Sequence, residues 1–99
     1  MLFADKIRLL REERQLLQRQ LASALDIDTP MYSRIERGDR PAKREQVIKL
    51  AKVFDTNVDE LLNLWMADKV YTILSEEENA NDILNIVAEN MVEYKKLKS

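Results

Sequence analysis

The stretch LQRQLASALDIDTPMYSRIERG, residues 17–38, holds two short segments in which apolar side chains recur every three or four positions. The first segment carries Leu21, Ala22 and Leu25, and the second carries Tyr32 and Ile35. This spacing places the apolar side chains of each segment on one face of a helix. Two helices this short, joined by about three residues, bury those faces only by crossing each other and resting on further helices. The stretch therefore predicts a helix-turn-helix.

The rest of the chain shows the same helical spacing. We expect helices over residues 3–14, 44–54 and 58–74, the last of them about 25 Å long at 1.5 Å per residue. Ser75 with Glu78 has the form of a capping box and predicts the start of a sixth helix, whose apolar residues are Ala80, Leu84, Val87, Met91 and Tyr94. This helix either folds back on the preceding one or pairs with a second chain. One Gly and two Pro among 99 residues favour an all-α fold.

The residue inventory excludes most kinds of catalytic and metal site. The chain contains no Cys and no His, so the usual zinc sites, thiol nucleophiles and histidine general bases are excluded. A single Gly also excludes a Gly-rich phosphate-binding loop. We therefore expect no enzyme activity, no metal and no cofactor.

The first ten residues, MLFADKIRLL, do not form a targeting or membrane segment. Their apolar run is interrupted by Asp5, Lys6 and Arg8, whereas a signal peptide or a membrane span needs an uninterrupted one. The protein is expected to stay in the cytoplasm, and the absence of Cys fits that compartment.

Charge is divided unequally along the chain. Residues 1–53 hold 12 Lys and Arg against 8 Asp and Glu, a net charge of +4, and residues 54–99 hold 4 against 10, a net charge of −6. A basic first part can face phosphates while an acidic second part faces away from them or contacts another protein. Ordinary solvated faces with a chance asymmetry are the alternative.

Two motifs in the quoted stretch resemble a known family. QxxLA at Gln18, Leu21 and Ala22, followed by a turn and by SRIERG at residues 33–38, resembles the phage-repressor and Cro type of DNA-binding domain, the XRE family. KLAKVFDTNVDELL, residues 49–62, resembles the way that this family closes its five-helix domain. The resemblance covers residues 3–64 and implies a helix-turn-helix DNA-binding domain over residues 1–64. Residues 65–99 are left as a helical extension for dimerisation or partner binding.

The resemblance also implies roles for individual side chains. Arg11 and Glu36 are expected to form a structural ion pair between the first and third helices. Base reading is assigned to four residues of the third helix, Thr29, Met31, Ser33 and Arg34. Phosphate binding is assigned to Gln18, Arg37, Arg40, Lys43 and Arg44. Exposed polar residues on any helix or loop look the same locally, so simple solvation is the alternative in each case.

The chain departs from the family pattern at both ends of the turn. Helices are expected over residues 18–25 and 30–37, but Leu17 stands where the family has a capping Ser or Thr, so a frayed start is predicted. Asp26 stands where the family has Gly, in a position that needs a positive φ, which Asp tolerates better than most residues. Thr29 followed by Pro30 is expected to cap the third helix, with Asp28 as the alternative.

These features predict a sequence-specific transcriptional regulator that binds an inverted-repeat operator as a homodimer, since one helix contacts few base pairs. Small repressors, restriction-modification controllers and antitoxins all fit, and a toxin is a possible partner. The alternative is a protein-interaction module that keeps the fold without binding DNA. The expected dimer interface consists of Trp65, Val70, Ile73, Leu74, Leu84, Val87 and Met91.

Overall fold

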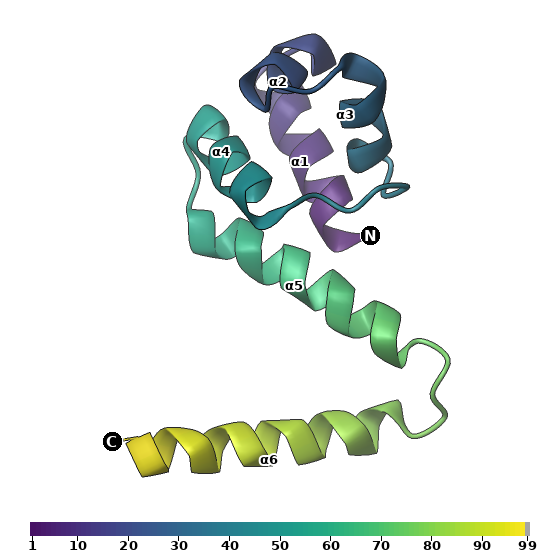
Figure 1. The fold of residues 1–99 in the computed structure, drawn as a ribbon, viewed down its shortest axis with the longest axis vertical. Coiled ribbons are helices and arrows are strands. Elements are labelled where there is room, and N and C mark those ends of the chain that lie inside the picture. Colours follow the sequence, from purple (N-terminus) through teal and green to yellow (C-terminus); the bar gives the residue numbers. More distant parts are fainter. Residues whose placement is uncertain (99) are drawn as a thin grey trace. The chain divides into compact units, whose positions relative to one another are not determined.

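The structure is a computed structural model that describes residues 1–98, which form six helices and no strand (Figure 1). The helices are α1 (Leu2–Glu13), α2 (Gln18–Ala24), α3 (Thr29–Glu36), α4 (Arg44–Phe54), α5 (Val58–Leu74) and α6 (Ala80–Lys98). The bounds of α1 to α5 lie within one residue of those predicted. The all-α fold class is confirmed.

The chain divides into two compact units, Met1–Lys69 and a second unit that begins at Val70. The core of the first unit consists of the apolar faces of α1 to α4 and the first half of α5. Its wholly buried side chains are Ile7, Leu21, Tyr32, Ile35, Val47, Leu50, Phe54 and Leu61. These are the apolar positions that helical spacing predicts should face inward.

The first unit extends past residue 64, where the sequence placed the domain boundary, because two further residues of α5 are buried in it. Trp65 is only 7% exposed and belongs to the hydrophobic core. Its indole Nε1 donates to the carbonyl oxygen of Ala42 at 2.8 Å. The Trp65 side chain is therefore occupied within its own unit and offers little surface to the dimer interface to which the sequence assigned it.

The second of these residues, Asp68, caps the first helix. Its carboxylate oxygens accept hydrogen bonds from the backbone N–H groups of Leu2 and Phe3, each at 2.9 Å. The first N–H groups of a helix have no acceptor within the helix, and a carboxylate satisfies them while complementing the positive helix end. A residue of α5 thereby fixes the start of α1.

The link between α5 and α6 differs from the prediction. Ser75 was expected to cap the sixth helix, but its hydroxyl donates to the carbonyl oxygen of Thr72 at 3.2 Å, within the end of α5. The sixth helix begins only at Ala80. Ser75 therefore ends one helix instead of beginning the next, and the capping-box assignment was wrong.

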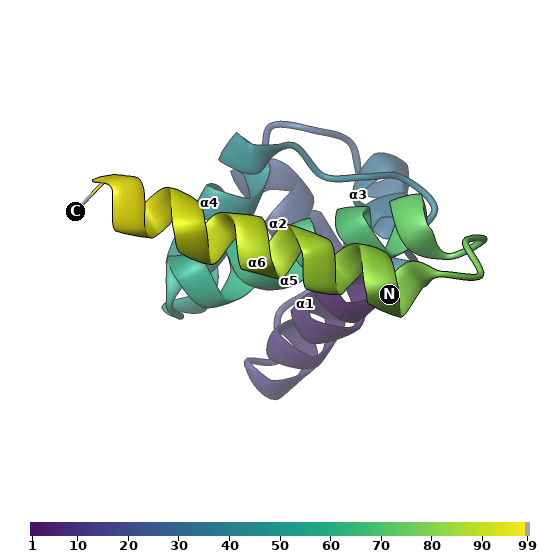
Figure 2. The ribbon, with the colours of Figure 1, turned by 90° about the horizontal axis from the view of Figure 1, so that it is seen from below.

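Helix α6 is one continuous helix in both views (Figures 1 and 2). Its predicted apolar residues Leu84, Val87, Met91 and Tyr94 are all exposed. In the preceding segment Val70 and Ile73 are exposed as well, and Leu74 is half-buried. None of the helices in the described part of the chain is both long and apolar enough to cross a membrane.

The Asp68 cap gives a direct test of the extended first unit. Asp68→Ala should lower the free energy of unfolding by about 1–2 kcal/mol, as loss of a helix-capping side chain typically does. Urea denaturation followed by circular dichroism at 222 nm measures the change. Glu93→Ala, which removes an exposed carboxylate from α6, is the matched control and should leave stability almost unchanged. Equal stability of the two variants would show that the cap contributes nothing.

Candidate DNA-binding surface

The turn between α2 and α3 has the backbone geometry that the motif requires. Asp26 adopts a φ of 58°, the left-handed conformation predicted for this position. The backbone N–H of Ile27 then donates to the carbonyl oxygen of Ala22 at 3.0 Å, which closes the end of α2. Ile27 packs against the core between the two helices. The turn thus fixes the angle at which α3 leaves α2.

The starts of α2 and α3 are held by different devices. The Leu17 side chain has no acceptor with which to cap α2, as the sequence predicted. Instead, the side-chain oxygen of Gln20 accepts a hydrogen bond from the backbone N–H of Leu17 at 2.7 Å. At α3 the carboxylate of Asp28 accepts from the backbone N–H of Met31 at 2.8 Å. Thr29 is therefore the first residue of the helix and not its cap, so the expected Thr29 cap is wrong and the Asp28 alternative is correct.

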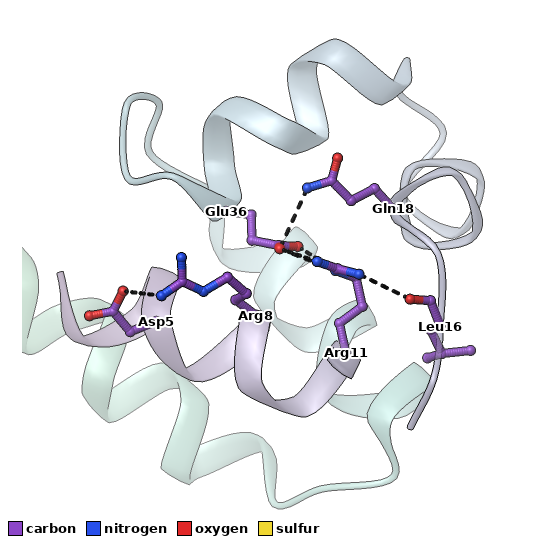
Figure 3. A network of polar contacts seen from close by, with 6 residues as sticks. All are labelled: Asp5, Arg8, Arg11, Leu16, Gln18 and Glu36. Atoms are coloured by element: carbon purple, nitrogen blue, oxygen red, sulfur yellow. Dashed lines mark hydrogen bonds and ion pairs between the residues drawn. The ribbon is translucent and has the colours of Figure 1, made fainter. Parts of the chain in front are cut away.

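One guanidinium group connects α1, the α1–α2 turn and α3 (Figure 3). Arg11 donates from Nη2 to Glu36 Oε1 at 2.8 Å and from Nε to Glu36 Oε2 at 2.9 Å. It also donates from Nη1 to the carbonyl oxygen of Leu16 at 3.1 Å. The Glu36 side chain is 2% exposed and the Arg11 side chain 17%. The ion pair is therefore largely removed from solvent.

The surroundings of Glu36 determine its protonation. Burial by itself raises the pKa of the carboxyl group, but the hydrogen bonds and charge of Arg11 outweigh burial and hold the pKa below its ordinary value. Burial, and then the neighbouring Glu36 carboxylate, raise the pKa of the Tyr32 hydroxyl. That hydroxyl makes no hydrogen bond of good geometry within the described residues. Glu36 is thus ionised and Tyr32 neutral at physiological pH.

Gln18 lies at the start of α2 and points toward the same carboxylate. Its side-chain nitrogen is 3.5 Å from Glu36 Oε1, a long hydrogen bond (Figure 3). A bond of that length is weak, so little energy is needed to turn the amide toward a phosphate. Its predicted role as a phosphate ligand stays a prediction.

The four residues predicted to read bases lie on the outer side of α3. Tyr32 and Ile35 fill the core side. Thr29 and Arg34 are exposed, whereas Met31 and Ser33 are half-buried. The exposed face of α3 therefore runs from Thr29 in the first turn to Arg34 in the last turn, with Arg34 as its longest side chain. Base reading by this face stays a prediction.

A basic loop follows α3 directly. Gly38 adopts a φ of +80°, a conformation that residues with a side chain rarely adopt, so the backbone favours glycine at this position. The carbonyl oxygen of Arg34 accepts from the backbone N–H groups of Asp39 at 2.9 Å and Arg40 at 3.3 Å, which ties the loop to the end of α3. The loop's position relative to the outer face of α3 is thus fixed by the backbone.

The predicted phosphate ligands of this region are all exposed. Arg40, Lys43 and Arg44 reach solvent. Arg37 is exposed too, and its Nε lies 3.3 Å from a carboxylate oxygen of Asp39. An ion pair this exposed contributes little energy, so Arg37 can exchange Asp39 for a phosphate. Arg37 and Arg40 lie at the end of α3, and Lys43 and Arg44 lie at the start of α4. The structure does not test whether these residues bind phosphate.

Sequence reasoning missed several residues that shape this surface. Gln46 accepts from the backbone N–H of Lys43 at 2.8 Å and so begins α4, as Gln20 does for α2. A Gln at the third helical position is the signal that could have revealed both. No local signal marks Trp65, whose indole supports the basic loop from α5.

With this geometry in place, comparison with known proteins identifies the motif. The sequence profile described as Helix-turn-helix, of XRE type, matches residues 7–61, more than half of the chain. The chain belongs to this family.

Two relatives agree with that placement. The cryptic phage CTXphi transcriptional repressor RstR of Vibrio cholerae is 32% identical over 102 residues, which cover 92% of this chain and 88% of that protein. The HTH-type transcriptional regulator YqaE of Bacillus subtilis (strain 168) is 26% identical over 84 residues, which cover 85% of this chain and 68% of that protein. No solved structure matches significantly. As an XRE-type helix-turn-helix protein, the chain is a DNA-binding transcription regulator and not an enzyme.

Removing one partner of the Arg11–Glu36 ion pair should destabilise the protein far more than replacing both partners. Arg11→Met leaves the Glu36 carboxylate buried without a partner and should lower the free energy of unfolding by about 3 kcal/mol. Adding Glu36→Met should recover most of that loss, because two apolar side chains of similar volume replace a buried pair at little cost. Urea denaturation at pH 7 of both variants and the wild type provides the measurement.

The same series has an expected pH dependence. The pKa of Glu36 is lowered in the folded protein, so its stabilisation is complete above the unfolded pKa of about 4.3 and is lost as the pH falls through the folded value. The difference between wild type and Arg11→Met should therefore be widest at neutral pH and narrow below about pH 4. A difference that stays constant from pH 7 to pH 3 would rule out the ion pair as its source.

Proposed function

We propose that the protein is a sequence-specific regulator that binds an inverted-repeat operator as a homodimer, with α3 of each subunit in one major groove. The observation that carries this proposal is the arrangement of α3: its polar outer face and the basic loop after it are held on one rigid frame by the Arg11–Glu36 pair. The major groove of B-DNA accommodates such a helix. A cytoplasmic location follows from a DNA target in that compartment.

Within this proposal the outer face of α3 reads base edges. Arg34 is exposed and carries the planar fork that matches O6 and N7 of guanine. Thr29 and Ser33 have hydroxyls that bond bases or phosphates, and Met31 offers an apolar surface to a thymine methyl group. Gln18, Arg37, Arg40, Lys43 and Arg44 bind phosphates and so fix the register of the helix on the duplex.

The homodimer is proposed because one recognition helix contacts too few base pairs to select a site in a genome. The exposed apolar stripe of α6, formed by Leu84, Val87, Met91 and Tyr94, is the proposed interface, together with Val70, Ile73 and Leu74. Exposed apolar stripes on a helix favour burial against a partner. Two-fold pairing would place the two copies of α3 about 34 Å apart, one turn of DNA.

The base-reading and phosphate-binding roles can be separated by substitution. Arg34→Ala should cost about 1–3 kcal/mol on the preferred operator and relax selectivity there, because it removes a base contact. Lys43→Ala should weaken binding to all DNA sequences alike and lower the salt dependence of the binding constant, because it removes a phosphate contact. Binding to a selected operator and to random duplex across a salt series measures both effects.

Lys52→Ala is the control for loss of positive charge, since Lys52 is exposed near the other end of α4. Equal losses on operator and random DNA for Arg34→Ala would remove that residue from base reading. A wild-type protein with no salt-dependent binding to any duplex would instead indicate an interaction module that does not bind DNA.

The dimer interface is tested on the α6 stripe. Val87→Asp puts a charge in the centre of the stripe and should shift the sedimentation profile to monomer and abolish cooperative binding to the two half-sites. Asn85→Asp adds the same charge on the opposite side of α6, two residues away, and should leave the dimer intact. Identical sedimentation of the two variants would remove the stripe from the interface. A second small protein found in constant ratio with monomers would point to a hetero-partner such as a toxin.

A further inference from the structure

Trp65 lies directly against the backbone that leads into α4. Its Nε1 donates to the carbonyl oxygen of Ala42 at 2.8 Å, and both residues are buried. Ala42 is followed at once by Lys43 and Arg44, two of the predicted phosphate ligands. One hydrogen bond from α5 thus fixes the backbone that carries these two cations.

The ring of Trp65 also contacts two cations directly. The guanidinium carbon of Arg44 lies 5.2 Å from the ring centroid, and the Nζ of Lys69 lies 3.7 Å from it. A cation over an indole face is attracted by the negative charge of that face. Arg44 nevertheless remains exposed, so its guanidinium is held by the ring on one side and open to solvent.

We infer that Trp65 is a positioning residue for phosphate binding: it holds the guanidinium of Arg44, with Lys69 beside it, ready to bind the phosphodiester backbone. This inference rests on the proposed function and adds to it a residue outside the matched helix-turn-helix segment, residues 7–61. A free arginine side chain loses rotamer freedom when it binds, and a side chain already held in place loses less. The ring therefore strengthens a contact that it does not make itself.

The second cation extends the phosphate-binding region to α5. Lys69 is the last residue of the first unit and is exposed. Lys69 places a second positive charge at the same ring as Arg44, and this charge adds to the attraction for a phosphate group. The ligand class is the phosphodiester backbone of duplex DNA, recognised without regard to sequence.

A double-variant cycle on random-sequence duplex tests the inference. The full chain is compared with Arg44→Ala, Trp65→Leu and the double variant, and the observed binding constant is followed over a salt series. Arg44→Ala should reduce the slope of log K against log salt concentration by about 0.9, the loss of one phosphate contact. In the Trp65→Leu background the same change should have a much smaller effect, because Arg44 is no longer held.

Two further variants separate positioning from folding. Trp65→Phe keeps an aromatic face and loses the N–H. In this background Arg44→Ala should therefore still reduce the slope of log K against log salt concentration by most of the wild-type amount. Arg44→Lys keeps the charge but not the planar group that stacks on a ring. This variant should bind random DNA more weakly than the wild type, with a nearly unchanged slope of log K against log salt concentration. Thermal unfolding by circular dichroism verifies that each variant is folded. Arg44 is exposed, so Arg44→Lys should fold like the wild type. Its binding result therefore tests the inference even if Trp65→Leu does not fold.

The outcomes distinguish this inference from the proposed function. Trp65 is the only tryptophan of the chain, so its emission provides an independent signal that should change when random duplex binds and change less in Arg44→Ala. Lys52→Gln, a matched loss of charge, should leave the emission change intact. Additive effects in the cycle together with wild-type binding by Arg44→Lys would overturn the inference while DNA binding itself remained. Absence of salt-dependent binding by the wild type would overturn both.

Discussion

The bidentate ion pair between Arg11 and Glu36 is the constraint on which the candidate DNA-binding surface depends. A pair this buried adds little net stability compared with apolar side chains, because both charges lose their hydration. What the pair does fix is geometry, since a planar guanidinium meets both carboxylate oxygens in one orientation only. Arg11 also binds the carbonyl oxygen of Leu16, so the same group sets α1, the first turn and the end of α3 relative to one another. The outer face of α3 follows from that arrangement.

Much of this fold could be predicted because its signals are local. Apolar residues repeat at helical spacing in every helix of the first unit, and the turn at Asp26 has a residue that tolerates a positive φ. Neighbouring candidates for one role were harder to separate. Asp28 and Thr29 both suit a helix cap, and proline fits the first or the second helical position. Only the observed bond from the backbone N–H of Met31 to Asp28 decides between them.

The contacts that the sequence did not reveal join residues that are distant along the chain. Trp65 has the spacing of an apolar helix face, and such spacing is the same whether the face meets its own core or another chain. Its partner Ala42 is 23 residues away, and the partners of Asp68 are 65 and 66 residues away. Nothing in the local pattern marks those contacts. The prediction that Ser75 caps the sixth helix was wrong for a local reason, because a hydroxyl near a helix boundary can bond to either helix.

The part of α5 that follows the matched family segment therefore stabilises the first unit. Asp68 satisfies the start of α1 and Trp65 supports the backbone that leads into α4. These two elements lie far apart in sequence, and one helical turn of α5 connects them, because residues 65 and 68 are neighbours on a helix surface. The charge division agrees with this arrangement: the net-positive segment 1–53 contains the whole predicted phosphate-binding set, and the proposed further ligand Lys69 lies on α5. The family motif alone does not account for the surface, because Trp65, whose indole bonds the carbonyl oxygen of Ala42, follows the matched segment in the sequence.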